Sequence, residues 1–235
     1  MPFITVITIN RNNAAGLQKT MQSVCAQDFK DLEYIVIDGA SDDGSLQVVE
    51  ANKGCVSHFI SEKDNGIYDA MNKGITKASG EYLLFLNSGD RFAEPDVLSK
   101  MKAEGRGEDI VSGNILFEEN GNTRRDFTPE KLSKFYLLHS MLYHPVTFIR
   151  KSLFDRFGLY DDNLRIVADY EFFLRILSKS KISYKHLHYD IVIFDNSGVS
   201  AAAATRKQML TERKAVQHKY FNMALLSLYY FLKSK

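Results

Sequence analysis

The stretch from residue 82 to residue 90 constrains the fold of this chain most strongly. It reads Tyr-Leu-Leu-Phe-Leu-Asn-Ser-Gly-Asp, five consecutive apolar residues followed at once by polar turn residues. A short apolar run of this kind predicts a strand buried on both faces, as in a parallel sheet. Gly89 permits a sharp turn before the carboxylate of Asp90. Because open α/β sheets bind ligands beyond the carboxyl ends of their strands, Asp90 is predicted at a binding rim, although Asn-Ser-Gly-Asp alone also fits an ordinary turn.

Strands and helices alternate through the first hundred residues. Apolar residues at helical spacing, such as Leu17, Met21 and Val24, follow the first β-branched run. Either Asn12 or Asn13 is expected to cap that helix. Alternation of this kind predicts βαβ units and a parallel, doubly wound sheet. The expected elements are strands at 3–9, 32–37, 59–60 and 82–86, and helices through 17–25, 46–51 and 67–78.

The second half of the chain has a different order of elements. An Asn-Gly pair at 120–121 is a strong hairpin signal. With no repeat and no flexible linker, we expect one α/β domain over residues 1–205, divided into halves at 1–100 and 101–205, followed by a helical tail at 206–235. The expected elements are strands at 110–117, 182–186 and 191–194, and helices at 129–138, 152–157, 169–177 and from 205 to the end.

Composition limits the classes of protein to consider. Apolar residues make up 45% and charged residues 25% of the 235 residues, as in ordinary globular proteins, and a net charge of +1 gives no case for nucleic-acid binding. Cys25 and Cys55 lack metal-ligand spacing and are expected as small buried thiols in a reducing cytosol. The chain shows neither a signal peptide at its start nor an apolar run of about 18 residues, so we expect a site facing the cytoplasm.

Three acidic residues follow strands or open helices, namely Asp38, Asp90 and Asp169. A carboxylate at the end of a buried strand is costly unless a cation, a hydrogen-bond donor or water meets its charge. A hard divalent cation takes one or two carboxylates together with substrate phosphates, which suits a nucleotide-diphosphate site. The glycine-rich phosphate loop and the Gly-x-Gly-x-x-Gly fingerprint are both missing, which argues against an NTPase or a dinucleotide enzyme.

Four segments of the chain, at residues 6–12, 35–45, 66–74 and 86–90, carry motifs of a known family. Together they resemble the family 2 glycosyltransferases, and most closely the bacterial enzymes that build capsules, exopolysaccharides and O-antigens. Their order and spacing match over roughly residues 3 to 200. The resemblance implies the GT-A fold, in which a nucleotide-binding half is fused to an acceptor half, and inverting transfer of a sugar. It also implies a divalent cation, Mn²⁺ or Mg²⁺, and a nucleotide-sugar donor, with a UDP-sugar favoured over a GDP-sugar.

The resemblance assigns roles to residues of the first half. Thr8 and Asn10 would lie beside the nucleoside, Asp38 near the base, and Asp69 and Asn72 at the border of the donor pocket. The second of the usual paired acids after the second strand is absent here, because Gly39 follows Asp38. The nucleobase is therefore left open.

The family's Asp-x-Asp region falls on Asn87, Ser88 and Asp90. Asp90 matches its metal-binding carboxylate. The first acid of that motif is not at its usual place, so Asn87 or Ser88 would have to serve instead. These three residues are expected to face the metal and the diphosphate.

In the second half, Asp169 matches the family's general base. An inverting transfer needs a carboxylate that takes the proton of the acceptor hydroxyl. Alone, this position also fits an acid that complements a helix dipole; together with the upstream motifs it favours the base. Glu171 is expected as a helper or a surface charge, and His144 either as a donor near the diphosphate or as a packed histidine. The segment 196–200 either closes on the donor or is a plain loop.

The tail at 206–235 is basic and carries a ten-residue apolar run. It fits a helix lying in a bilayer interface, where it would bring the enzyme to the inner face of the membrane and to a lipid-linked glycan acceptor. Packing on the body of the protein, or on a second subunit in a homodimer, fits equally well.

The sequence thus predicts an inverting, metal-dependent glycosyltransferase. One alternative is a sugar-phosphate nucleotidyltransferase, which would need a glycine-rich basic loop that residues 10–16 do not supply. Another is a non-catalytic nucleotide- or sugar-binding module, which would have no need of a base at Asp169.

Overall fold

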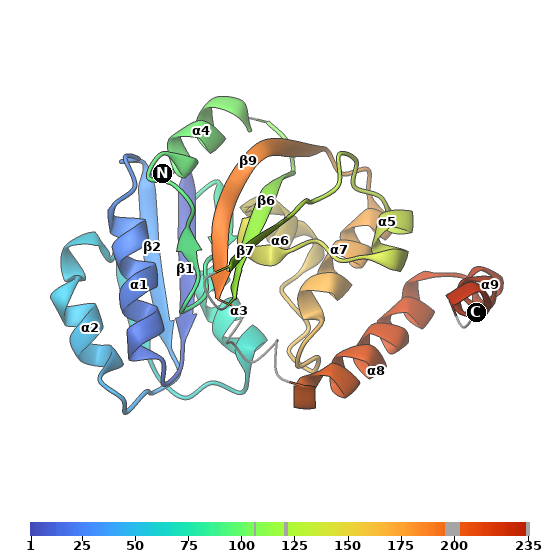
Figure 1. Cartoon of the computed structure of the whole chain (residues 1–235), viewed down its shortest axis with the longest axis horizontal. Coiled ribbons are helices and arrows are strands. Elements are labelled where there is room, and N and C mark those ends of the chain that lie inside the picture. The colour runs from blue at the N-terminus through green and yellow to red at the C-terminus, as the bar shows by residue number, and fades with distance from the viewer. Residues whose placement is uncertain (106, 120–121, 196–202, 234–235) are drawn as a thin grey trace.

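The protein is an α/β structure built on one curled, mixed sheet (Figure 1). The computed structural model describes residues 1–105, 107–119, 122–195 and 203–233. The sheet has the strand order β3-β2-β1-β4-β8-β6-β9-β5, and β7 pairs with β6. The predicted α/β class is confirmed, with β1, β2, β3 and β4 parallel as expected.

Most predicted elements are present with small shifts of their ends. The strands are β1 Ile4–Asn10, β2 Leu32–Asp38, β3 His58–Ser61, β4 Tyr82–Phe85, β5 Arg91–Phe92, β6 Ile110–Glu119, β7 Asn122–Asp126, β8 Thr147–Arg150 and β9 Tyr184–Asp195. The helices are α1 Ala14–Cys25, α2 Ser45–Ala51, α3 Ile67–Lys77, α4 Val97–Glu104, α5 Lys134–His139, α6 Lys151–Phe157, α7 Ala168–Lys179, α8 Ala203–Tyr220 and α9 Met223–Lys233, with short 3-10 turns at Lys53–Cys55 and His144–Val146.

Strand β4 joins the two halves of the sheet. It runs parallel to β1 on one side and antiparallel to β8 on the other. All four of its residues are buried, as the apolar run predicts. Leu83 and Phe85 belong to the core shared with α3 and α7, whereas Tyr82 and Leu84 belong to the core under α1 and α4. Helices therefore cover both faces of β4, and its carboxyl end is fixed between two cores.

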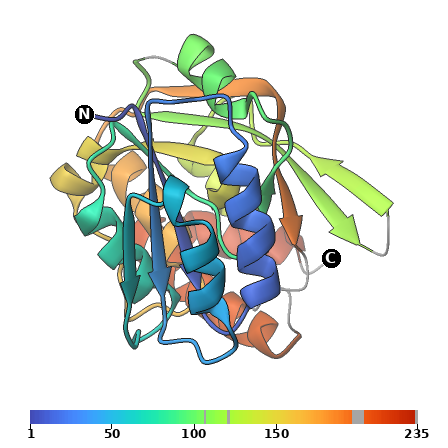
Figure 2. The ribbon, with the colours of Figure 1, turned by 90° about the vertical axis from the view of Figure 1, so that its left-hand side faces the viewer.

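Two predictions in the second half need correction, and one helix at the boundary between the halves was missed. The strands expected at 182–186 and 191–194 are one strand, β9, because register shifts against β6 let it continue through polar residues. Helix α5 begins at Lys134 and not at 129, since Ser133 caps it by accepting a hydrogen bond from the Tyr136 amide. Helix α4 was not predicted. The turn at 120–121 lies outside the described residues, although β6 and β7 do pair as the hairpin requires (Figure 2).

The expectation of two isolated buried thiols is wrong. Cys25 and Cys55 form a disulfide, with their Cα atoms 5.7 Å apart, and Cys25 is exposed. The cause is the packing of α1 beside α2, which brings the end of one helix to the turn that follows the other (Figure 2).

The tail is two helices and not one. Helix α8 ends at Tyr220, and the Asn222 side chain then accepts a hydrogen bond from the Leu225 amide and caps α9. Helix α8 packs against α7, whereas α9 exposes several large apolar side chains. No helix within the described residues combines the length and apolar character needed to cross a bilayer.

Candidate active site

Asp38, at the end of β2, has every side-chain oxygen engaged. Its carboxylate is 3% exposed and accepts hydrogen bonds from Asn10 Nδ2 at 2.8 Å, from the Ser41 amide at 2.9 Å and from Ser61 Oγ at 2.8 Å. Burial raises the pKa of Asp38, but these hydrogen bonds outweigh it and lower the pKa below its ordinary value. The structure therefore brings Asn10 and Asp38 together at the ends of β1 and β2, with the ionised Asp38 carboxylate fully hydrogen-bonded.

Thr8 lies on β1, two residues before Asn10, and its side chain has no exposed surface. Its hydroxyl donates to the Leu86 carbonyl at 2.7 Å and lies 3.0 Å from Tyr34 Oη. In this position Thr8 fixes the end of β4 against β1.

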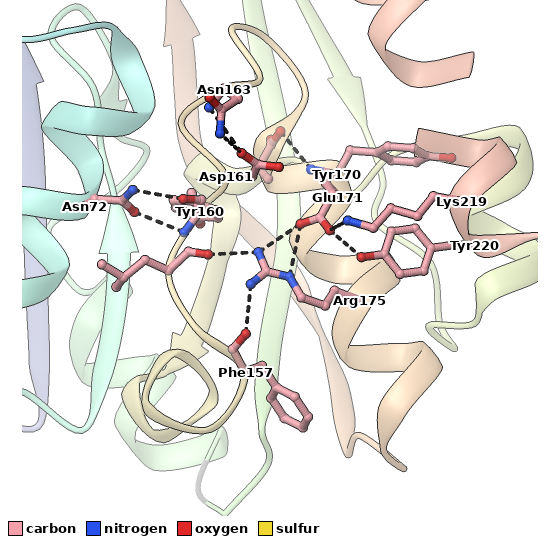
Figure 3. A network of polar contacts seen from close by, with 12 residues as sticks. Asn72, Phe157, Tyr160, Asp161, Asn163, Tyr170, Glu171, Arg175, Lys219 and Tyr220 are labelled. Atoms are coloured by element: carbon pink, nitrogen blue, oxygen red, sulfur yellow. Dashed lines mark hydrogen bonds and ion pairs between the residues drawn. The ribbon is translucent and has the colours of Figure 1, made fainter. Parts of the chain in front are cut away.

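Asp69 and Asn72, on α3, are used in contacts within the protein. Asp69 accepts from the Asn65 amide at 2.9 Å and lies 3.4 Å from Lys73 Nζ. Asn72 exchanges two hydrogen bonds of 3.0 Å with the backbone of Tyr160, as Figure 3 shows. These contacts tie α3 to the loop before it and to the second half of the chain.

The turn between Asn87 and Asp90 is held from α1. Thr20 Oγ1 accepts from the Gly89 amide at 3.0 Å and donates to the Asp90 carbonyl at 2.6 Å. Gly89 has a φ of +110°, which explains why glycine is needed there. Ser88 exchanges hydrogen bonds of 3.2 Å with Asn13, the cap of α1. Sequence reasoning missed Thr20, because its position in the helix pattern carries no sign of this role.

The side chain of Asp90 meets a second carboxylate. Asp90 is 3% exposed, and its Oδ1 accepts from the Asp195 amide at 3.0 Å. A Cβ added at Gly89 would lie 2.8 Å from Asp195 Oδ2, so the Asp195 carboxylate lies directly against this turn. Burial raises the pKa of Asp90 to about 7, and the nearby charge of Asp195 adds to the rise.

The neighbouring carboxylates of Asp90 and Asp195 offer the oxygen ligands that a hard divalent cation takes, and such a cation would compensate the buried charge. Asp195 was not predicted, although it carries the same signal as Asp38 and Asp90, an acid that ends a strand. The strand predicted at 191–194 stops one residue before Asp195, the last residue of β9.

His144 lies between Asn87 and Asp169. The Asn87 amide nitrogen is 3.1 Å from His144 Nε2, and His144 Nδ1 is 3.3 Å from Asp169 Oδ2. If the amide donates to Nε2, the ring proton is on Nδ1 and points to the carboxylate. His144 is also close enough to Asp90 for a charge on the ring to lower the pKa of Asp90, although burial has the larger, opposite effect.

Asp169, in the first turn of α7, is 2% exposed. Its Oδ1 accepts from the Tyr170 amide at 2.8 Å and lies 2.9 Å from Tyr68 Oη. Its Oδ2 faces His144. Tyr68 comes from α3, so the two halves of the chain meet at this carboxylate. Side-chain contacts thus connect Asn87 to His144 and His144 to Asp169, and Asn87 lies in the same turn as Asp90.

Glu171 makes its contacts elsewhere, apart from Asn87, His144 and Asp169. It is 2% exposed, which contradicts a surface charge, and Figure 3 shows it held by Arg175, Lys219 and Tyr220. Arg175 Nη2 lies 2.8 Å and Lys219 Nζ 3.2 Å from the carboxylate. Glu171 therefore fastens α8 to α7. The predicted loop at 196–200 lies outside the described residues.

This architecture, with carboxylates at the carboxyl ends of a mostly parallel sheet and a second half that supplies a buried acid, is that of a GT-A glycosyltransferase. The chain belongs to glycosyl transferase family 2, whose family model matches residues 5–161. It is 40% identical over 179 residues to an uncharacterized glycosyltransferase of Mycobacterium tuberculosis strain H37Rv, covering 74% of this chain and 68% of the relative. It is 33% identical over 138 residues to the GalNAc(5)-diNAcBac-PP-undecaprenol beta-1,3-glucosyltransferase of Campylobacter jejuni, covering 57% of this chain and 45% of that protein.

Solved structures show the same fold. S. aureus TarS 1-349 in complex with UDP superposes with a TM-score of 0.70 at 18% identity, over 82% of this chain and 60% of that one. The mannosyltransferase PcManGT of Pyrobaculum calidifontis, in complex with GDP-Man and Mn²⁺, superposes with a TM-score of 0.69 at 16% identity, over 94% and 65%. This chain therefore spans less than two thirds of either solved chain.

Proposed function

We propose that this protein is an inverting, metal-dependent hexosyltransferase that moves a sugar from a nucleotide-diphosphate sugar to a hydroxyl of a glycan acceptor in bacterial surface polysaccharide synthesis. One observation carries the proposal. Two carboxylates with different surroundings, Asp90 and Asp169, are linked through Asn87 and His144 across the boundary between the two halves.

Asp169 is the proposed general base. Oδ1 is held by Tyr68 and by a backbone amide, which leaves Oδ2, with its longer contact of 3.3 Å to His144, to accept the proton of the acceptor hydroxyl. His144 orients this oxygen, and the imidazole stabilises the negative charge before transfer. Since α7 and α3 are both packed in the core, the base has a fixed direction.

Asp90 and Asp195 are the proposed holders of a divalent cation, Mn²⁺ or Mg²⁺. Bound there, the cation would supply charge neutralisation for the departing diphosphate. Asn87 has a buried side-chain oxygen that has no hydrogen-bond partner in the described part of the chain, and Ser88 is the neighbouring hydroxyl. These two side chains are proposed to face the diphosphate, whereas Asn10 and Asp38 shape the nucleoside end.

The donor is proposed to be a UDP-sugar, with a GDP-sugar as the alternative. Solved structures with this fold hold UDP in one case and GDP-Man with Mn²⁺ in the other. Asp69 and Asn72, one turn apart on α3, are proposed to reach the border of the donor pocket through the backbone that they hold in place.

The acceptor is proposed to be lipid-linked, in line with the undecaprenol in the name of the C. jejuni relative. The enzyme would then meet the inner face of the membrane through α9, whose exposed apolar side chains adjoin basic residues of the tail. Substituting Leu228 and Phe231, 58% and 57% exposed, by serine should weaken binding to phosphatidylglycerol vesicles at least about tenfold. Leu46→Ser, on α2, is the matched control. Unchanged vesicle binding in the double variant would assign α9 to a subunit contact, which sedimentation would reveal as a dimer.

Asp169→Asn tests the proposed chemistry. The amide is nearly isosteric but cannot take a proton, so turnover should fall by roughly 10²–10⁴-fold while donor binding survives. Donor binding is measured by calorimetry and turnover by nucleotide release. Tyr68→Phe is the matched control, since it removes a hydrogen bond to the same carboxylate but leaves the base, and it should cost far less. Retention of more than about a third of wild-type turnover by Asp169→Asn would refute the base assignment.

A further inference from the structure

A second group of metal-ligating side chains lies where β9 meets the segment between β7 and α5, away from Asp90. Glu130, His186 and His188 each offer one ligand atom, and these atoms all lie within 4.8 Å of one another. The two histidines are two residues apart on a strand, a spacing that projects side chains from the same face. Glu130 belongs to the segment between β7 and α5. Seven residues of strand separate His188 from Asp195, a distance of roughly 20 Å.

His186 has an unusual arrangement of partners. Its side chain is 3% exposed, and its Nε2 lies 3.2 Å from the Asn114 side-chain oxygen. That oxygen only accepts hydrogen bonds, so Nε2 carries the ring proton and the lone pair of a neutral ring is on Nδ1. Nδ1 has no hydrogen-bond partner within the described residues, yet lies 3.2 Å from Glu130 Oε1. A lone pair and a carboxylate repel each other at this distance unless a proton or a metal cation lies between them.

The two separations from Glu130 are close to those around a tetrahedral metal ion, and the two histidine ligand atoms lie within 4.8 Å of each other. Bonds of about 2.0–2.1 Å in tetrahedral geometry place ligand atoms about 3.3 Å apart. Glu130 Oε1 lies 3.2 Å from His186 Nδ1 and 3.7 Å from His188 Nδ1. The contact of His186 Nε2 with Asn114 is the outer hydrogen bond that typically orients a metal-binding imidazole. Glu130 and His188 are 70% and 76% exposed, so an ion can enter and keep a water ligand.

We propose that Glu130, His186 and His188 bind a divalent transition-metal ion. Two imidazoles and one carboxylate suit Zn²⁺ better than Mg²⁺ or Ca²⁺, which take oxygen ligands. The site is separate from Asp90 and serves structure. By joining Glu130 to β9 it clamps the 127–133 segment, which leads through α5 towards His144, onto the sheet. Thr128 already fixes this segment at one point, through its hydrogen bond to the Gly113 carbonyl at 3.1 Å.

Calorimetric titration of ZnCl₂ into chelator-treated, tag-free protein tests the proposal. We expect saturable one-to-one binding that raises the melting temperature and slows hydrogen exchange in residues 127–133. His188→Ala and Glu130→Gln should each weaken binding by more than about tenfold, as even outer-shell substitutions do at metal sites. Both side chains are exposed, so the melting temperature in chelator should not change.

Two control variants locate the site. His218→Ala removes an exposed histidine outside the group and should bind Zn²⁺ like the wild type. Asp90→Asn should do the same, since it changes only the other proposed cation site. The proposal is overturned if the wild type binds no Zn²⁺, or if His188→Ala and Glu130→Gln bind it as tightly as His218→Ala does. It is equally overturned if Asp90→Asn abolishes the binding.

Discussion

Asp38 and Asp90 follow the two strands that flank β1, and both are 3% exposed, yet their surroundings differ completely. Around Asp38, donors from Asn10, Ser41 and Ser61 outweigh the cost of burial and lower its pKa. Around Asp90, burial dominates and raises the pKa to about 7, next to a second acid at Asp195. Four hydrogen bonds meet the Asp38 carboxylate, whereas the Asp195 amide donates to that of Asp90, the proposed cation ligand. Burial of an acid at a strand end does not by itself distinguish the two cases.

The same isosteric change, Asp to Asn, should lower the stability of the protein at Asp38 but not at Asp90. Asp90→Asn is expected to have the largest effect on transfer, a loss of about 10³-fold, because cation stabilisation of the leaving group is worth several kcal/mol. Its stability should not fall, since the amide removes a buried charge. Turnover with saturating Mn²⁺ and thermal unfolding would measure the two effects. If Asp90→Asn keeps Mn²⁺-dependent binding of UDP or GDP, the cation is bound elsewhere.

The difference in stability between Asp90→Asn and the wild type should depend on pH, because only the wild type carries the titrating carboxyl group. The raised pKa of Asp90 means that the folded state binds a proton more tightly than the unfolded state, in which the pKa is near 3.8. That stabilisation is complete below about pH 4 and is lost as the pH rises to about 7. Measured without metal, Asp90→Asn should match the wild type near pH 4 and exceed it at pH 8. An equal difference at both pH values would contradict the assignment of the shift to Asp90.

Asp38→Asn should reduce stability by about 1–3 kcal/mol, because an amide nitrogen would face donors that now meet an oxygen. The sign of the pH dependence is also opposite. The lowered pKa of Asp38 stabilises the fold above its ordinary pKa of 3.8, and this contribution is lost as the pH falls through the folded-state value. Denaturant titrations of wild type and variant at pH 7 and pH 3 measure both effects. A variant as stable as the wild type at pH 7 would show that the Asp38 network contributes little.

Affinity for the cation should follow the titration of Asp90. The cation needs the ionised carboxylate, so the dissociation constant for Mn²⁺ should rise about tenfold for each pH unit below 7. Calorimetry between pH 5.5 and 8 in the presence of UDP measures it. Asp38 is already ionised over this range, so Asp38→Asn should leave the slope unchanged. A pH-independent affinity would argue that Asp90 is not a ligand.

The sequence predicted local features well and long-range contacts poorly. The apolar run at 82–86 identified β4 and placed Asp90 at its carboxyl end, because burial on two faces is visible in composition. Motif resemblance brought in Asp169. Neither indicated Asp195 or Thr20, whose roles depend on strand register and on the packing of α1, over separations of 105 and 70 residues. The disulfide and the burial of Glu171 were missed for the same reason: each depends on which helices pack together.

Thr20 and Thr8 allow the comparison with the smallest expected effect. Each hydroxyl holds the backbone at the end of β4, but only Thr20 contacts the turn that carries Asp90. Thr20 contacts the turn that carries Asp90, while Thr8 donates to the Leu86 carbonyl before that turn. Replacing either by the nearly isosteric valine removes these hydrogen bonds to the backbone, two at Thr20 and one at Thr8, and should cost about 1–3 kcal/mol of stability. Thr20→Val leaves the Gly89 amide without its acceptor, so the turn relaxes and the Asp90 carboxylate loses its fixed position.

We therefore expect Thr20→Val to weaken Mn²⁺ binding about tenfold, an effect of the size seen when outer-shell groups of metal sites are removed. Thr8→Val should lose comparable stability and keep wild-type affinity for Mn²⁺. Calorimetry below the melting temperature of both variants separates the two effects. Equal loss of Mn²⁺ affinity in both variants would mean that the end of β4 responds as one unit, and that Asp90 depends on general stability and not on the turn that Thr20 holds.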